Sequence, residues 1–195
     1  MTESLQPGQY PAQYESSATF PGRLKAYVRP IRPDDDGRLS ALFASHSVET
    51  IYQRYFTHLK QIPTELLKKF VSVDYVNDMA LVAFRKINGE ERFIAVGRYF
   101  KNPTTQFAEV AVTIDDPYQK KGIGTFLLEK LKQIALENGI KGFTASMLAT
   151  NQGMIHLFSH VLGKHEARYA DGLYYVRKQF APDKRKVPPV KTTKN

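Results

Sequence analysis

The segment that tells most about the fold is Asp115-Asp116-Pro117-Tyr118-Gln119-Lys120-Lys121-Gly122-Ile123-Gly124-Thr125. An apolar strand pattern, Phe107–Ile114, precedes it, and an apolar helical pattern begins near Gly124. Glycines at such a junction let consecutive backbone N–H groups converge ahead of a helix N-terminus, where they bind phosphate oxygens. Lys120 and Lys121 add full positive charges. The stretch therefore predicts a pyrophosphate-binding loop; the alternative is that its glycines only bend the chain.

Two other phosphate-binding loops do not fit this stretch. A Walker loop requires Gly-Lys-Ser/Thr at a set distance from a first glycine, and that pattern is absent. A Rossmann loop requires a third glycine, but Thr125, Phe126 and Leu127 follow Gly124. The strand before the loop also belongs to a hairpin meander rather than to a parallel strand–helix–strand unit.

Upstream of the loop, alternating residues at 24–29 predict a strand, and Asp34, Asp35 or Asp36 can cap a helix after it. Two further helices are expected at 48–59 and 64–71. Strands at 79–84 and 92–100 flank Asn88-Gly89, a hairpin turn, and the strand at 107–114 completes an antiparallel meander.

Downstream, the helix after the loop is expected to stop at Asn138-Gly139, where glycine can adopt the left-handed conformation. A strand at 143–148, a helix at 154–162 and a last strand at 169–177 follow. These elements predict an α/β (α+β) fold with a single mixed, mostly antiparallel sheet flanked by helices.

The ends of the chain differ from its middle in composition. Residues 1–22 are rich in Pro, Gly, Gln and Ser, which predicts a flexible leader, although Tyr10 and Tyr14 could dock on the domain. Residues 23–180 form the predicted domain, and residues 181–195 form a basic tail that we expect to be flexible.

Composition excludes several classes of protein. The chain of 195 residues has no cysteine, which excludes disulfides, thiolate zinc sites, iron–sulfur clusters and cysteine nucleophiles. Its apolar runs reach six residues, at 79–84, whereas a membrane span needs about 20. The first residues lack the basic start and apolar stretch of a signal peptide, so we expect a cytoplasmic protein.

The net charge of +9 favours anionic partners but does not choose among them. The tail carries five basic residues against one acidic residue, which leaves open a nucleic-acid contact through residues 184–194. We do not expect nucleic acid to be the partner, because no binding signature accompanies the charge. His156, His160 and His165 could form a metal site, but no carboxylate accompanies them at ligand spacing, and we expect no metal.

The loop sequence Gln119-x-x-Gly122-x-Gly124 resembles the acyl-CoA pyrophosphate loop of the GNAT superfamily of N-acetyltransferases. The order of elements is similar to that of the GNAT acyl-CoA N-acyltransferase fold over about residues 24–177. The segments at 29–35, 52–56 and 74–83 look like those of the acetyltransferase domain of bacterial protein lysine acetyltransferases.

This resemblance implies acetyl-CoA as cosubstrate and assigns its contacts. The main chain of Val112 and Ile114 would pair with the pantetheine amides. The residues expected to hold the pyrophosphate are Gln119, Lys120, Lys121, Gly122, Ile123, Gly124 and Thr125. Asn151, Met154 and Phe158 would lie beside the pantetheine arm.

The resemblance also implies direct attack of a neutral amine on the thioester within a ternary complex. A lysine amine has an ordinary pKa of about 10.4, so a base must remove a proton at neutral pH. The resemblance assigns this role to Glu109, unless Glu109 is structural and pairs with Arg98. Phe158 stands where many family members carry a proton-donating tyrosine, which leaves solvent, His156 or His160 to protonate the thiolate.

The expected acceptor is an accessible lysine of a protein substrate. A small-molecule amine acetyltransferase and a non-catalytic acyl-CoA-binding module are the alternatives, and no membrane partner is expected. The identity of the acceptor, the acyl-chain preference, the regulator and the oligomeric state stay open.

Overall fold

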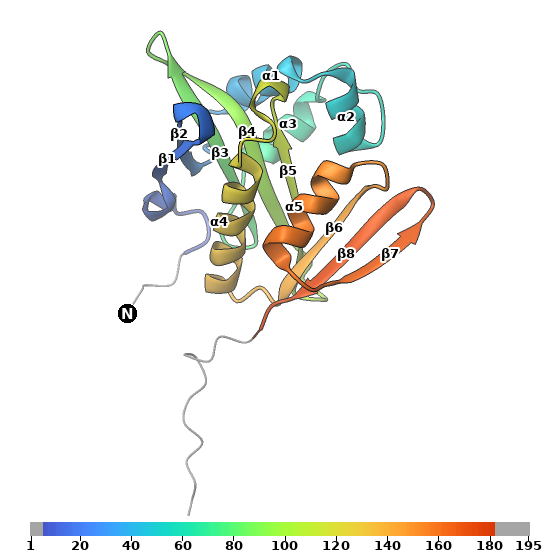
Figure 1. The fold of residues 1–195 in the computed structure, drawn as a ribbon. Coiled ribbons are helices and arrows are strands. Elements are labelled where there is room, and N and C mark those ends of the chain that lie inside the picture. The colour runs from blue at the N-terminus through green and yellow to red at the C-terminus, as the bar shows by residue number, and fades with distance from the viewer. Residues whose placement is uncertain (1–5, 182–195) are drawn as a thin grey trace, which may run out of the picture.

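The computed structural model describes residues 6–181, which form an eight-stranded sheet with helices on both faces (Figure 1). The strands are β1 (Ser16–Phe20), β2 (Leu24–Pro30), β3 (Asp78–Ile87), β4 (Glu90–Lys101), β5 (Phe107–Ile114), β6 (Gly142–Leu148), β7 (Glu166–Ala170) and β8 (Leu173–Gln179). The helices are α1 (Asp36–Ser45), α2 (Val48–Tyr55), α3 (Thr64–Val71), α4 (Ile123–Glu137) and α5 (Gln152–Leu162), with single turns η1 (Ala12–Tyr14), η2 (Pro21–Arg23) and η3 (Asp116–Tyr118). None of these helices is long and apolar enough to cross a membrane.

The strand order is β1-β2-β3-β4-β5-β6-β8-β7. Only β5 and β6 pair in parallel, and every other neighbouring pair in this sheet is antiparallel. The predicted mixed, mostly antiparallel sheet is therefore confirmed. The predicted turn at Asn88-Gly89 is also confirmed: the backbone φ angles are 52° and 85°, the left-handed values that a tight hairpin requires.

The expected leader contributes to the sheet. Residues 16–20 form β1, which pairs with β2 from Ser16 opposite Val28 to Phe20 opposite Leu24. The Tyr14 hydroxyl donates a hydrogen bond to Glu137 on α4 at 2.6 Å. Residues 16–20 of the expected leader are thus part of the sheet, because the edge of β2 offers hydrogen bonds to this Ser- and Thr-containing stretch. Residues 1–5 and the predicted tail from residue 182 lie outside the described residues.

Two boundary predictions were wrong. The single strand expected at 169–177 is the β7–β8 hairpin, because Asp171 and Gly172 adopt φ angles of 52° and 75° and turn the chain back. The helix expected to reach residue 59 ends at Tyr55, because Phe56 takes a left-handed conformation and closes the helix.

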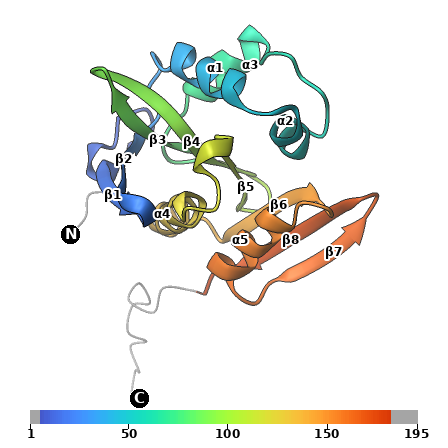
Figure 2. The ribbon, with the colours of Figure 1, turned by 45° about the horizontal axis from the view of Figure 1, so that its top comes forward.

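Helices lie on both faces of the sheet (Figure 2). A cluster of buried hydrophobic side chains lies beneath them on each face. On one face α4 packs on β3, β4 and β5, with Leu127 and Leu131 fully buried, and α5 packs against α4. A Cβ at Gly97 would lie 2.9 Å from Leu131 Cδ1, so this glycine lets α4 lie close to β4. On the other face α1 and α3 cover Ala80, Val82 and Phe93.

Strands β5 and β6 pair over only three positions, Phe107 to Glu109 with Gly142 to Thr144. Beyond Glu109 the two strands diverge (Figure 1). The remaining half of β5 keeps its antiparallel pairing with β4, so its other edge is open. A fork is thereby built into the middle of the sheet.

Gly142 holds the base of this fork together. An added Cβ would clash with the Lys178 carbonyl oxygen and come within 2.5 Å of the Phe107 ring. Gly142→Ala is therefore expected to lower the free energy of unfolding by about 1–3 kcal/mol, the usual cost of overpacking. Urea unfolding measures this, with Gly37→Ala as control because no heavy atom lies within 4 Å of its added Cβ. Equal stabilities of the two variants would show that the sheet adapts here.

His46, between α1 and α2, is expected to make the free energy of unfolding depend on pH. Both ring nitrogens are buried without a hydrogen-bond partner in the described residues. Burial lowers the pKa of His46, against the opposing charges of Asp115 and Asp116. The folded state thus binds the proton less readily than the unfolded state. The free energy of unfolding is therefore highest above about pH 6.5 and decreases as the pH falls below that value. Urea unfolding at about pH 7.5 and about pH 5.5 should show this loss, and His46→Gln should reduce it. An unchanged pH dependence in the variant would contradict the assignment.

Candidate functional site

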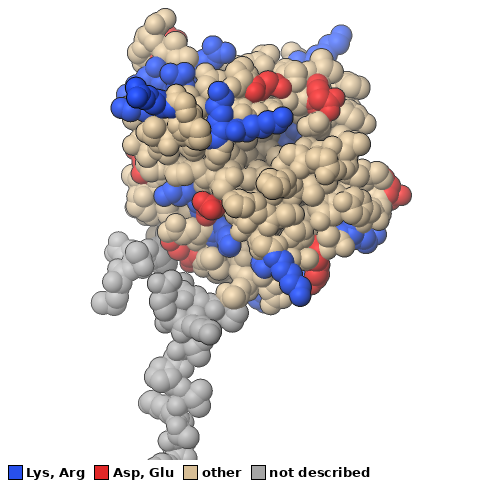
Figure 3. Space-filling model, viewed as in Figure 1, with Lys and Arg blue, Asp and Glu red and all other residues tan. Residues whose placement is uncertain are grey.

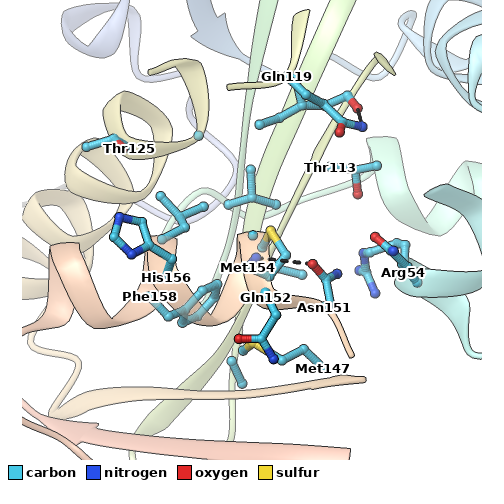
Figure 4. A pocket seen from close by; sticks show the side chains of 18 of the residues that line it. Arg54, Thr113, Gln119, Thr125, Met147, Asn151, Gln152, Met154, His156 and Phe158 are labelled. Atoms are coloured by element: carbon cyan, nitrogen blue, oxygen red, sulfur yellow. Dashed lines mark hydrogen bonds between the residues drawn. The ribbon is translucent and has the colours of Figure 1, made fainter. Parts of the chain in front are cut away.

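A cavity of about 750 Å³ occupies the fork between β5 and β6. Its other walls are α2, the loop before α4, and the first half of α5 (Figure 4). Ten of the twelve residues predicted to bind the cofactor line it: Val112, Ile114, Gln119, Lys120, Gly122, Gly124, Thr125, Asn151, Met154 and Phe158. Lys121 does not line it, and Ile123 is buried in the core instead.

The loop before α4 leaves backbone N–H groups free at the cavity wall. Gly122 caps the helix with a φ of 84° and no side-chain hydrogen bond. The first helical hydrogen bond runs from the Phe126 N–H to the Gly122 carbonyl oxygen at 3.0 Å. The N–H groups of residues 123–125 therefore have no acceptor within the helix, and such groups bind anions. Several Lys and Arg side chains gather beside a hollow on this face (Figure 3).

The two loop glycines have different physical roles. Gly122 is needed for its positive φ, which side chains rarely tolerate. A Cβ at Gly124 would lie 3.0 Å from both Ile114 Cδ1 and Leu157 Cδ2. Gly124 therefore lets α4 approach β5 and α5 closely, a packing role beyond the approach to phosphate.

Gln119 ties the loop to its neighbours. Its Nε2 donates to the Ile114 carbonyl oxygen and to Thr50 Oγ1, both at 3.2 Å. Beside it the Asp116 carboxylate accepts hydrogen bonds from the backbone N–H and hydroxyl of Ser47 and from the Thr50 hydroxyl. Burial alone would raise the pKa of Asp116, but these hydrogen bonds outweigh it and lower the pKa. The wall formed by α2 is thereby fixed against the loop.

The opposite wall is the start of α5. Asn151 is buried, and its Oδ1 accepts a hydrogen bond from the Met154 N–H at 3.1 Å, which caps the helix (Figure 4). Met154 and Phe158 follow on the cavity side. Asn151 thus sets where α5 begins and how its side chains meet the cavity.

Glu109 lies at the last paired position of β5 and β6 and is exposed. It lines a second cavity of about 560 Å³ that also contacts β7 and β8, rather than the larger one. The two cavities share Ala145 and Ser146 on β6. The pairing of Glu109 with Arg98 that the sequence left open is not observed, because Arg98 Nη2 donates to the Phe70 carbonyl oxygen at 3.0 Å.

Comparison with known proteins identifies the family of this chain. Residues 45–163 match the model of the acetyltransferase (GNAT) family. The chain belongs to the GNAT family of acetyltransferases. The acetyltransferase is 31% identical over 127 residues to Acetyltransferase PA5475 of Pseudomonas aeruginosa, an alignment that covers 65% of this chain and 68% of that protein.

Two further similarities concern proteins named Pat. The acetyltransferase is 34% identical over 132 residues to Acetyltransferase Pat of Mycolicibacterium smegmatis, covering 66% of this chain but only 38% of that protein's length. The crystal structure of the GNAT domain of S. lividans PAT superimposes with a TM-score of 0.79 at 29% identity, covering 88% of this chain and 100% of that one.

The three histidines considered for a metal site, His156, His160 and His165, lie in different surroundings. His156 and His160 line the large cavity with ring centroids 6.4 Å apart. The His165 Nδ1 instead lies 2.7 Å from the Gly163 carbonyl oxygen. Across residues 6–181 no cluster of three His, Asp or Glu side chains could hold a metal ion.

Sequence reasoning missed the cavity residues of α2: Thr50, Gln53 and Arg54 line it, as do Ala111 and Thr113 of β5. Arg54 and Thr113 lie on the side of the cavity opposite Thr125 and His156 (Figure 4). A polar helix face gives no local signal of what it will meet, so only the folded chain reveals this wall.

Proposed function

We propose that this acetyltransferase transfers the acetyl group of acetyl-CoA to a protein lysine amine by direct attack, with Glu109 as general base. The observation that carries the proposal is the fork in the sheet. It joins a loop with free backbone N–H groups, at one end of a large cavity, to the Glu109 carboxylate in a second cavity that shares Ala145 and Ser146 with the first.

The residues present fit the coenzyme. The free N–H groups at the start of α4 and the nearby Lys120 would hold the pyrophosphate. The open edge of β5 at Val112 and Ile114 offers main-chain hydrogen bonds to an extended amide arm. Asn151, Met154 and Phe158 form the facing wall. When bound, the coenzyme supplies an acetyl thioester that an amine can attack.

The two cavities allow the two substrates to arrive from different sides. A lysine side chain entering the smaller cavity would pass Glu109 before reaching the shared residues Ala145 and Ser146. Glu109 would accept a proton from its ammonium group, and the neutral amine would then attack the thioester carbonyl. Phe158 cannot protonate the departing thiolate, so solvent, His156 or His160 would do so.

The test measures coenzyme A release from acetyl-CoA with three acceptors: a mixture of lysine-rich proteins, the same mixture with its lysines chemically blocked, and a panel of polyamines and amino acids. We expect release with the first alone, and acetyl-lysine in its digest by mass spectrometry. Release with small amines alone would instead favour a small-molecule acetyltransferase. Tight binding without release would favour a non-catalytic module. The cytoplasmic location stays a prediction.

A further inference from the structure

Arg98 on β4 is a buried charge that forms no ion pair with a carboxylate of residues 6–181. It is 5% exposed and stands opposite Ala111 of β5. Its guanidinium lies over the Phe70 ring at 4.2 Å and donates from Nη2 to the Phe70 carbonyl oxygen, but Nη1 is buried without a partner in the described residues. An unpaired buried charge is costly, so its presence calls for an explanation.

A second arginine stands between Arg98 and the large cavity. Arg54 on α2 lines that cavity and also a small pocket of about 20 Å³ that contains Arg98. Ala111 and Thr113 likewise line both spaces. A pocket of this size has room for about one water molecule. Because Arg54, Ala111 and Thr113 border both spaces, a water molecule in the small pocket could bridge Arg98 towards a group that Arg54 contacts in the large cavity.

The positive charges of Arg54 and Arg98 are not neutralised by ion pairs within the described residues. Burial and the nearby charge of Arg54 lower the pKa of Arg98 to about 10, against the opposing effects of Tyr55 and Asp78. Neither Arg54 nor Arg98 forms an ion pair with Asp78 or any other carboxylate among residues 6–181. Arg54 and Arg98 thus border the same small pocket, and no carboxylate of the described chain pairs with either.

We propose that Arg54 and Arg98 form a carboxylate-binding subsite in the wall of the large cavity beside Ala111 and Thr113. This inference rests on the proposed function and narrows its substrate class. Arg54 would contact the carboxylate directly with its planar fork of donors, and Arg98 would act through its charge and a bridging water. The carboxylate belongs either to a dicarboxylic acyl group on the coenzyme or to an acidic side chain next to the acceptor lysine.

The experiment compares kcat/KM for acetyl-CoA and succinyl-CoA, each with a peptide whose lysine is flanked by glutamate or by glutamine. We expect the carboxylate-bearing member of one comparison to be preferred by about 10-fold to 100-fold, the effect of one charge-assisted hydrogen bond. A preference for succinyl-CoA would show that the carboxylate belongs to the acyl group. A preference for the glutamate-flanked peptide would show that it belongs to the acceptor. In Arg54→Gln the ratio of the two kcat/KM values should fall towards one. The control Arg92→Gln removes an exposed charge from the same strand as Arg98 and should keep the wild-type ratio. Equal rates in both comparisons, or the same preference in Arg54→Gln, would overturn the proposal.

Arg98→Met separates recognition from folding. A buried charge without an ionic partner costs free energy through its desolvation, and methionine removes that cost, so the melting temperature should hold or rise while the preference falls. A lower melting temperature with an unchanged preference would make Arg98 a structural residue and contradict the proposal.

A binding measurement distinguishes failure of the subsite from failure of the proposed function. If no acceptor gives turnover, the melting temperature is measured against free succinate, with a matched neutral diamide as control. The subsite predicts a rise with succinate in the wild type that Arg54→Gln loses. Absence of that rise would contradict the subsite, whether or not the protein transfers acetyl groups.

Discussion

Glu109→Gln is expected to lower turnover by about 100-fold to 10,000-fold, the usual contribution of a general base, while acetyl-CoA affinity stays nearly intact. Glutamine has the shape of glutamate but cannot accept the proton. Glu109 is exposed and outside the large cavity, so neither the fold nor the coenzyme site should change. Rates of coenzyme A release and calorimetric titration with acetyl-CoA measure the two effects separately.

The pH profile sharpens this prediction. The variant should recover activity as the pH rises, because more of the acceptor amine is then neutral without help from the protein. Glu129→Gln is the matched control, since Glu129 is an exposed carboxylate on α4 outside both cavities. Wild-type turnover in Glu109→Gln at neutral pH would remove the base assignment.

Gly153→Trp is expected to abolish acetyl-CoA binding. Gly153 lines the large cavity in the first turn of α5, and an added Cβ would meet only Asn151 Oδ1, at 3.8 Å. The indole can therefore enter the cavity without a clash at its base and would occupy the space of the coenzyme. At 100 times Kd the wild type should gain about 2.7 kcal/mol from its ligand, which corresponds to a melting-temperature rise of roughly 5–10 °C at this chain length. The variant should gain nothing.

Gly37→Trp provides the comparison for this substitution. Gly37 is exposed on α1, and no heavy atom lies within 4 Å of its added Cβ. This variant should bind acetyl-CoA as the wild type does and should show the full thermal shift. Undiminished binding by Gly153→Trp would place the coenzyme elsewhere.

The parts of the fold that the sequence predicted are those with local signals. Asn88-Gly89 and Asn138-Gly139 mark turns through their backbone preferences, and the strand at 107–114 leads directly into the glycine loop. Asp171-Gly172 carries the same signal and forms the turn of the β7–β8 hairpin, where a single strand was expected. Strand β1 had no such signal, because it is ordered by the edge of β2 rather than by its own composition.

The same distinction applies to the site. The loop and the start of α5 are contiguous segments, so their residues could be expected to lie together. Arg54 reaches the cavity only because α2 is fixed to the loop through Thr50, Gln119 and Asp116. Arg98 is buried away from solvent because its guanidinium lies over the Phe70 ring of α3 and donates a hydrogen bond to the Phe70 carbonyl oxygen. Both features arise from contacts between distant segments, which a single sequence does not reveal.

The measurement that tests the central claim most directly is the melting temperature of the whole chain against acetyl-CoA concentration, with a nicotinamide dinucleotide and ATP as controls. If the fork holds acetyl-CoA, the melting temperature rises with acetyl-CoA and follows RT ln(1 + [L]/Kd), and the controls leave it unchanged. A flat response to acetyl-CoA, or an equal rise with either control, would contradict the assignment of this cavity as an acyl-CoA site.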